Sequence, residues 1–334
     1  MAVILVTGGM GFIGSNFIHY WKKHHPQDHV LNVDLLTYAG NKDNVASLVG
    51  QAGYEFVQGD IGDEAHLSQL MQKGVEVVVH FAAESHVDRS IHSPRDFVMT
   101  NVLGTQSLLA AARQHKVKKF VHISTDEVYG SLGDAGAFTE KTALAPNSPY
   151  SASKAGSDLI VRAYFETYGF PAVITRCSNN YGPRQFPEKL IPLIITRAIR
   201  NEPIPIYGDG LNVRDWLYVE DHCSAIERVI QAGVPGEVYN IGGHQERTNL
   251  DVVKSILKEL NKSEDLIHFV PDRLGHDRRY AIDSSKIQQE LGWAPSYSFE
   301  AGLQKTIQWY LKERTWCERI ADGSYRDTEE VDHS

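Results

Sequence analysis

A tyrosine and a lysine stand one helical turn apart in the segment Tyr150-Ser151-Ala152-Ser153-Lys154. On a helix they would share one face, so the Lys154 ammonium could stabilise the phenolate form of Tyr150. A free tyrosine has a pKa of about 10, so it needs such help to accept a proton at neutral pH. This pair predicts a base that deprotonates a hydroxyl while hydride leaves the same carbon. Chance matches on surface helices are common, so the pair alone does not decide the chemistry.

Two neighbouring carboxylates, Asp126 and Glu127, form a second group that can do chemistry. They follow an apolar run that predicts a strand, and ligands of open α/β sheets bind at the carboxyl ends of strands. Adjacent like charges, partly desolvated, tend to keep one carboxyl protonated, which suits an acid and base pair. Thr125 can hydrogen-bond a substrate hydroxyl. The alternative is an ordinary acidic helix N-terminus without a catalytic role.

A glycine turn near the amino end predicts a dinucleotide site. Gly8, Gly11 and Gly14 lie between a predicted strand and a predicted helix, where backbone and helix N-terminus can approach a pyrophosphate. Asp34 ends the second predicted strand and can accept the adenosine ribose hydroxyls. Because Asp34 would repel a 2′-phosphate, NAD is favoured over NADP. Asp60 either flanks the adenine or caps the helix that follows.

These groups require a parallel α/β sheet to position them. Apolar, mostly β-branched runs alternate with helical patterns, as in strands that are buried on both faces. Strands are expected at residues 3–6, 30–33, 55–57, 75–79, 120–123 and 172–176, and helices at 15–24, 95–114, 150–168, 223–231, 250–260 and 300–312. The predicted fold is α/β, a Rossmann-type doubly wound parallel sheet with a smaller, mixed α/β C-terminal domain that binds substrate.

The expected division is residues 1–177 for the NAD-binding domain, 178–321 mainly for substrate and 322–334 as a polar tail. Residues 211–243 return in part to the first domain, with 238–241 crossing back to the sheet.

Composition narrows the functional classes. The chain has 334 residues, 42% of them hydrophobic and 22% charged, which is ordinary for a globular protein. Its net charge of −9 argues against nucleic-acid binding. No apolar stretch approaches the roughly 20 residues of a membrane span, and the first residues read as a strand rather than a signal peptide. The scattered cysteines Cys177, Cys223 and Cys317 predict neither a disulfide framework nor a metal site, and favour the cytoplasm.

Together these motifs resemble the extended short-chain dehydrogenase/reductase superfamily and, within it, the dTDP-glucose 4,6-dehydratase family. The resemblance spans residues 3 to 310. The superfamily motifs are the glycine turn, Phe81-Ala82-Ala83, Asn101, Tyr150 and Lys154. The more discriminating motifs lie at residues 83–90, 124–130, 178–183, 212–216 and 275–280. Related 4-epimerases generally carry Ser or Thr in place of the Asp126-Glu127 pair.

The resemblance implies a sugar-nucleotide dehydration with NAD as the cofactor and dTDP-glucose as the substrate. Tyr150 would deprotonate the C4 hydroxyl, Thr125 would position it, Glu127 would take the C5 proton and Asp126 would protonate the departing C6 hydroxyl. The implied cofactor contacts are Gly8, Gly11, Phe12, Ile13, Gly14, Asp34, Leu35, Leu36, Thr37, Asp60, Ile61, Ala82, Ala83, Glu84, Ser85, Thr100, Tyr150, Lys154 and Asn180. The implied substrate contacts are Ser85, His86, Thr125, Asn179, Lys189, Leu190, Pro205, Tyr207, Arg214, Asn249, Asp272, Arg273 and His276.

Two positions depart from the family pattern. Leu35 stands where many relatives carry Lys, and Leu274 stands where Pro is usual. Both departures are expected to change affinity and not reaction type. The rival hypotheses are another NAD-dependent sugar-nucleotide enzyme, such as a 4-epimerase or a decarboxylase, and a catalytically idle dinucleotide-binding regulator. The family further implies a homodimer formed through the helices expected at residues 95–114 and 150–168.

Overall fold

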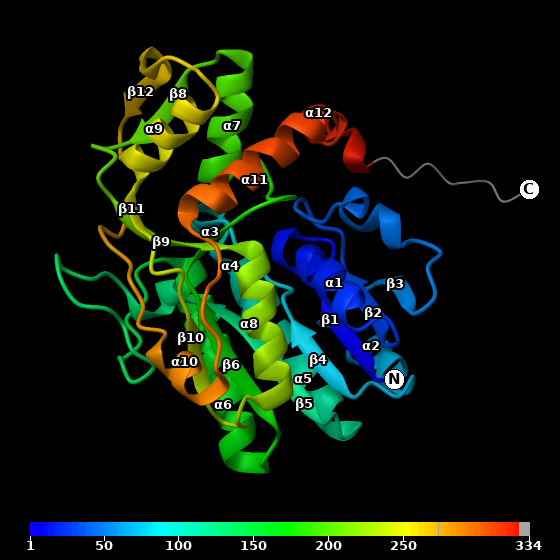
Figure 1. Ribbon diagram of the computed structural model, residues 1–334. Helices are drawn as coiled ribbons and strands as arrows, with labels where there is room; N and C mark the ends of the chain where they lie inside the picture. Colours follow the sequence, from blue (N-terminus) through cyan, green and yellow to red (C-terminus); the bar gives the residue numbers. More distant parts are fainter. Residues whose placement is uncertain (273, 327–334) are drawn as a thin grey trace, which may run out of the picture.

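The centre of the molecule is a parallel sheet of seven strands in the order β10-β6-β5-β4-β1-β2-β3. The computed structural model describes residues 1–272 and 274–326 (Figure 1). The strands are β1 (Val3–Thr7), β2 (His29–Asp34), β3 (Tyr54–Gln58), β4 (Val77–His80), β5 (Lys119–Thr125), β6 (Ala172–Cys177) and β10 (Val238–Ile241). The last of these is the segment that was expected to cross back to the sheet, and it pairs with β6.

Helices cover both faces of this sheet, as the doubly wound prediction requires. One face packs against α1 (Phe12–His24) and α8 (Val219–Ala232), and the other against α2 (Glu64–Met71), α5 (Thr105–Gln114) and α6 (Pro149–Tyr168). Alternate residues of β1 point to opposite faces, since Ile4 and Val6 join the first cluster and Leu5 joins the second. The fold class expected from the sequence is therefore confirmed.

The single helix expected over residues 95–114 is wrong in its middle. The structure has α4 (Pro94–Phe97), a π-helical segment η2 (Val98–Gly104) and then α5. Asn101 within η2 binds the Glu84 backbone through both amide atoms, at 2.9 and 3.0 Å, and donates to Ser153 Oγ at 2.8 Å. Widened helical turns often lie at functional sites, and the hydrophobic periodicity of a helix does not reveal them.

A second lobe sits above the carboxyl end of the sheet (Figure 1). Its strands form the small sheets β11-β9-β7 and β12-β8, and one apolar cluster joins its helices. Its strands are β7 (Asn179–Tyr181), β8 (Ile204–Tyr207), β9 (Val213–Tyr218), β11 (Glu246–Thr248) and β12 (Ile267–Val270). Its main helices are α7 (Leu190–Arg200), α9 (Asn249–Glu259), α11 (Phe299–Lys312) and α12 (Arg314–Asp322), while α10 (Ser285–Leu291) packs beside β10. The domain boundary itself stays a prediction.

Two further short elements matter for the site. The helical turn η1 (Lys42–Leu48) follows β2, and η5 (Ser324–Arg326) follows α12. Because Tyr325 is buried, the beginning of the expected polar tail packs onto the protein. Over the described residues, no helix is long and apolar enough to cross a membrane.

Candidate active site

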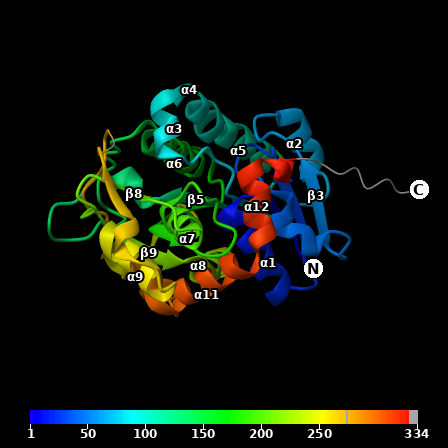
Figure 2. The same cartoon turned by 90° about the horizontal axis from the view of Figure 1, so that it is seen from above.

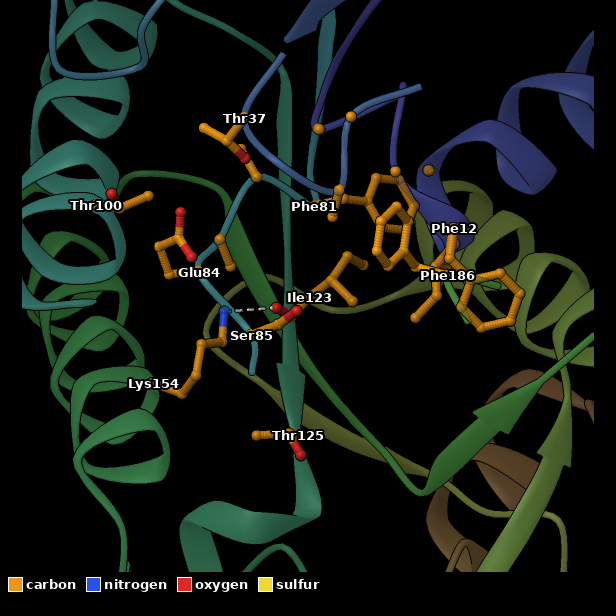
Figure 3. A pocket seen from close by; sticks show the side chains of 18 of the residues that line it. Phe12, Thr37, Phe81, Glu84, Ser85, Thr100, Ile123, Thr125, Lys154 and Phe186 are labelled. Atoms are coloured by element: carbon orange, nitrogen blue, oxygen red, sulfur yellow. Dashed lines mark hydrogen bonds between the residues drawn. The ribbon is translucent and has the colours of Figure 1, made fainter. Parts of the chain in front are cut away.

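A cavity opens at the carboxyl ends of β1, β2, β4, β5 and β6, where an open α/β sheet binds its ligands. Its walls bring together the glycine turn, the end of β2, the segment after β4, the start of η3 (Asp126–Tyr129) and one face of α6 (Figure 3). Segments that are far apart in the sequence thus share one surface.

The glycine turn is built for close approach by a ligand. Gly8 has a φ of +72°, and a Cβ there would lie 2.6 Å from the Ala82 nitrogen. A Cβ on Gly14 would lie 2.3 Å from the Gly8 oxygen. Gly11 caps α1 without a side-chain hydrogen bond, and the first turn of α1 carries no acidic residue. The N–H groups and positive dipole of α1 therefore fit the pyrophosphate of a dinucleotide.

Asp34 is held at the end of β2 by two backbone groups. Its Oδ2 accepts from the Met10 N–H at 2.9 Å, and its Oδ1 accepts from the Leu36 N–H at 2.8 Å. Burial raises the pKa of Asp34, while these two hydrogen bonds oppose the rise. Each oxygen keeps a second lone pair that can accept a ribose hydroxyl, so this carboxyl group fits the adenosine ribose.

All the expected cofactor residues but one line the cavity. They are Gly8, Gly11, Phe12, Ile13, Gly14, Asp34, Leu35, Thr37, Asp60, Ile61, Ala82, Ala83, Glu84, Ser85, Thr100, Tyr150, Lys154 and Asn180. The exception is Leu36, whose side chain packs against the core cluster beside α1. Its φ is +58°, and its N–H donates to Asp34, so the cofactor contact expected of Leu36 stays a prediction.

Tyr150 and Lys154 lie in the first turns of α6, which Ser148 begins with a reciprocal capping box. The Lys154 Nζ donates to the Ile123 carbonyl at 2.9 Å, which is the dashed line in Figure 3. Burial lowers the pKa of Lys154 to about 8. Burial and the nearby Glu127 raise the pKa of Tyr150, whereas a hydrogen bond with Thr125 lowers it.

The chain by itself therefore does not depress the Tyr150 pKa, and the stabilisation of its phenolate by Lys154 together with a bound cofactor stays a prediction. Burial is the largest cause of the raised pKa of Tyr150, and the Lys154 ammonium binds the Ile123 carbonyl. A positive ligand charge beside Tyr150, such as an oxidised nicotinamide ring, would favour its phenolate. The same cavity that holds the glycine turn also holds Tyr150, so the two features can act together.

Asp126 and Glu127 open η3 at the end of β5. Asp126 is 1% exposed, and burial, then the charges of Glu127 and Asp215, raise its pKa well above the usual value. The Thr125 hydroxyl donates to Asp126 Oδ1 at 3.3 Å, and it also accepts from the Glu127 N–H at 3.3 Å. A carboxyl whose pKa is raised suits the acid of an acid and base pair.

Behind the Asp126–Glu127 pair lies a buried polar network that the sequence analysis did not predict. Asp158 lies one turn beyond Lys154 on α6, and its Oδ2 accepts from Arg176 Nε at 2.8 Å. Arg176 also donates to the Tyr129 hydroxyl at 2.9 Å, and Tyr129 ends η3. Asp158 is therefore linked to both catalytic segments. The helical spacing of Lys154 and Asp158 was the available signal.

The expected substrate residues divide into two groups. Ser85, Thr125, Asn179 and Lys189 line the cavity, and Lys189 Nζ donates to the Ser85 carbonyl at 3.0 Å. The residues that do not line it are His86, Leu190, Pro205, Tyr207, Arg214, Asn249, Asp272 and His276. Arg273 lies outside the described residues.

Several of the remaining residues form local contacts of their own. The rings of Tyr207 and His276 meet edge to face at 6.3 Å, and His276 Nδ1 lies 2.6 Å from Asp272 Oδ1. Arg214 is buried, donates to the Asp277 carbonyl at 2.9 Å and stacks on Tyr280. Within the described part of the chain, no group of three or more His, Cys, Asp or Glu residues could hold a metal ion.

The cavity also has lining residues that the sequence did not suggest. Among these are Gln185, Phe186 and Glu188, from the loop between β7 and α7. Glu188 accepts from the Tyr38 hydroxyl at 2.9 Å, which ties this loop to the segment after β2. No motif predicted this contact, because it joins loops that are distant in the sequence.

Comparison with known proteins places this architecture in context. The family model described as GDP-mannose 4,6 dehydratase matches residues 5–306. A dTDP-glucose 4,6-dehydratase of Xanthomonas campestris is 53% identical, with 98% of each chain covered, and one of Escherichia coli is 50% identical, with 96% of this chain and 97% of the relative covered.

Solved structures agree with these relatives. The dTDP-glucose 4,6-dehydratase DesIV of Streptomyces venezuelae, solved with NAD bound, has a TM-score of 0.93 and 49% identity, covering 95% of this chain and 99% of that one. A UDP-glucose 4-epimerase of Thermotoga maritima has a TM-score of 0.87 and 30% identity, covering 93% of this chain and 99% of that one.

Proposed function

Because this chain belongs to the dTDP-glucose 4,6-dehydratase family, we propose that it converts dTDP-glucose into dTDP-4-keto-6-deoxyglucose and water. It is an NAD-dependent lyase. One observation carries the proposal: Tyr150 and the Asp126–Glu127 pair face the same cavity as a glycine turn that fits a dinucleotide. One bound sugar can therefore reach a base for the oxidation step and an acid and a base for the elimination step.

The glycine turn, Asp34 and the lining residues of the segments after β3 and β4 would hold NAD. When bound, it supplies the acceptor for the C4 hydride and the donor that returns this hydride to C6. Thr37 and Thr100 add hydroxyls along the same wall (Figure 3). Because the cofactor ends unchanged, the net reaction is a dehydration.

In the oxidation, Tyr150 takes the proton of the C4 hydroxyl while that carbon loses hydride. Thr125, which is hydrogen-bonded with Tyr150, orients the same oxygen. Lys154, fixed on the Ile123 carbonyl, keeps a positive charge near the developing phenolate at neutral pH. The step yields a ketone at C4, which acidifies the hydrogen on C5.

In the elimination, Glu127 removes the C5 proton and Asp126 protonates the leaving C6 hydroxyl, which departs as water. Because the pKa of Asp126 is raised, its carboxyl group can carry the proton that this step consumes. Since the two residues are adjacent in η3, one segment can serve both carbons. After hydride reaches C6, C5 is reprotonated and the pair returns to its starting state.

The sugar nucleotide is proposed to extend from Tyr150 towards the second lobe. Lys189 lines the cavity, and Arg214 adds a buried positive charge beyond it. Tyr207 is 44% exposed and offers a ring on which the base can stack. In this division, the residues up to 177 hold NAD, and 178–321 mainly hold substrate.

We further propose a homodimer in the cytoplasm. Exposed apolar side chains lie on the helices expected to form the interface, namely Val98, Met99, Leu103 and Leu159. Their exposed fractions range from 45% to 57%, and burying them against a second copy would remove apolar surface from water. The free cysteines suit a reducing compartment.

Incubation of the purified protein with dTDP-glucose and NAD, followed by mass analysis, tests the function. The expected product has lost one water. Conversion to the galactose isomer at unchanged mass would identify an epimerase instead. No conversion by a protein that binds NAD would indicate the idle regulator.

A further inference from the structure

The last described helix of the chain crosses from the second lobe to the dinucleotide side. After α11, the elements α12 and η5 reach the part of the molecule that holds α1 and β2 (Figures 1 and 2). We call residues 314–326 the C-terminal strap. Beneath it lie residues 35–48, here called the cofactor loop, which follow β2 and include Thr37, Ala39 and Gly40 of the cavity wall.

Three side chains fasten the strap to the cofactor loop. The Trp316 indole N–H donates to Asn44 Oδ1 at 2.9 Å, and both residues are buried. Arg319 pairs with the Asp43 carboxylate at 2.9 Å. The Tyr325 hydroxyl donates to the backbone carbonyl of Tyr38. The strap therefore holds this loop at Tyr38 and at the neighbouring residues Asp43 and Asn44.

The Trp316 contact continues into the dinucleotide site. Asn44 donates through Nδ2 to the Met10 carbonyl at 2.9 Å, and this carbonyl also accepts from the Asn41 N–H at 3.0 Å. The Met10 N–H in turn donates to Asp34 Oδ2 at 2.9 Å. A continuous set of hydrogen bonds thus connects the strap to the glycine turn and to the ribose carboxylate.

The Tyr325 contact reaches the opposite wall of the cavity. Its ring packs edge to face on Phe186 at 5.9 Å, and Phe186 packs in the same way on Tyr38 at 5.8 Å. Tyr38 donates to Glu188, which lines the cavity. The strap therefore lies behind two walls at once, and displacing it would loosen both.

We propose that the C-terminal strap positions the cofactor loop and the glycine turn, and so slows the release of NAD. Trp316 and Asn44 are the main positioning residues. A wall held in its binding geometry loses less conformational freedom when the ligand binds. Long residence suits the reaction, because the hydride taken from C4 must return to the same sugar. The inference rests on the proposed cofactor but not on dehydratase activity.

The test compares two tryptophan substitutions in the holoprotein. Trp316→Phe removes the indole N–H that binds Asn44 and keeps an aromatic ring in place. Trp309→Phe is the matched control, since its ring contacts Trp316 at a centroid distance of 4.9 Å and, in the part of the chain that the structure describes, its N–H makes no hydrogen bond to the cofactor loop. The rate of NAD release is measured after dilution into buffer that contains no sugar and an enzyme that consumes free NAD, so that released NAD cannot rebind. The melting temperature of each variant is measured in parallel.

Trp316→Phe is expected to release NAD about tenfold faster than wild type, because it leaves the buried Asn44 oxygen without its donor. Trp309→Phe should release NAD at the wild-type rate even if its melting temperature falls equally. Equal release rates in Trp316→Phe and wild type, or equal acceleration by both variants, would overturn the proposal. If Trp316→Phe does not fold, Tyr325→Phe provides the same comparison through the Tyr38 carbonyl.

The results of the NAD-release experiment can be distinguished from those of the dehydration assay. A wild-type protein that binds NAD but dehydrates no sugar would refute the dehydratase and still allow the release comparison. A wild-type protein that binds no NAD would refute both. Hydrogen exchange in the apoprotein gives an independent readout: amides of the cofactor loop should exchange faster in Trp316→Phe than in Trp309→Phe.

Discussion

The dinucleotide side of the cavity and the sugar-nucleotide side are built in different ways. The first uses short contiguous segments at the carboxyl ends of adjacent parallel strands, and nearly all of its expected residues line one cavity. Most residues expected on the second side lie on loops and small sheets of another lobe. Of the expected substrate residues in the described part of the chain, Ser85 and Thr125 reach the cavity from the sheet, and Asn179 and Lys189 reach it from the other lobe. The proposed function thus places chemistry on the sheet and recognition of the nucleotide on more variable connections.

This difference predicts different consequences of substitution on the two sides. On the sheet side, Asp126, Tyr150 and Lys154 are buried and held by neighbours, so removing a proposed catalytic group there should abolish a chemical step. On the loop side, Tyr207 is exposed and its loss should change affinity. The following predictions run from the largest expected effect to the smallest.

Removing the proposed base should have the largest effect. Tyr150→Phe keeps the ring packed beside Phe97 but deletes the hydroxyl. We expect C4 oxidation to fall by about 10²–10⁴-fold, the usual contribution of a positioned acid or base, with NAD binding retained. Single-turnover absorbance of the reduced cofactor measures this step. Near-normal turnover would show that another group is the base.

Separating the two halves of the reaction should have the next largest effect. Asp126→Asn removes the proton donor for the C6 hydroxyl, so elimination should slow by about 10²-fold while C4 oxidation survives. Rapid quenching followed by mass analysis should then reveal an oxidised sugar that has not lost water. An equal loss of both steps would contradict the division of roles between Tyr150 and Asp126.

The buried carboxylate behind Lys154 should control the alkaline limb of activity. Burial lowers the Lys154 pKa to about 8, and the negative charge of Asp158 opposes this. Asp158→Asn removes the opposing charge, so the Lys154 pKa should fall further. Because Lys154 supports the phenolate only when protonated, activity is present below its pKa and lost above it. The descending limb of kcat should therefore move about one unit towards lower pH.

A pH profile of kcat from about pH 6 to about pH 9 measures this shift. Asp158→Glu is the control, since it keeps the charge near Arg176 and Lys154, and its alkaline limb should stay close to that of wild type. If both variants lose activity uniformly at every pH, the role of Asp158 is structural and not electrostatic.

The smallest effect is expected on the loop side. Tyr207→Ala removes a half-exposed ring from the proposed base site, and loss of one stacking contact should raise KM about fivefold with kcat unchanged. Steady-state kinetics with dTDP-glucose measure both constants. Phe269→Ala, which removes another exposed ring from β12 beside β8, serves as the control and should leave KM unchanged. A large fall in kcat for Tyr207→Ala would contradict the prediction that substitutions on the loop side change affinity and not chemistry.

The sequence predicted the groups whose partners are local. The positions of Gly8, Gly14 and Asp34 could be predicted because a turn, a close approach and a strand end depend on a few neighbouring residues. The proposed catalytic residues could be placed from the sequence because Tyr150 and Lys154 share a helix face and Asp126 follows a strand. The sheet followed from buried β-branched runs, and its strands differ only at their ends, whereas η2 interrupts the helix expected over residues 95–114.

The rest depended on contacts between distant segments. The π-helical turn at Asn101 is fixed by the Glu84 backbone and Ser153, which no periodicity includes. The Trp316–Asn44 hydrogen bond joins residues separated by 272 positions. Side chains of this kind are positioned by packing and not by propensity, so a single sequence carries no signal for them.

The internal return of hydride is the central claim, and isotope tracing tests it most directly. The purified protein is given NAD and dTDP-glucose that carries deuterium at C4, and the product is examined by mass spectrometry and NMR. We predict a product that has lost one water and carries the deuterium at C6. Deuterium lost to solvent, or found again at C4 of a hexose that has kept its C6 hydroxyl, would contradict the account.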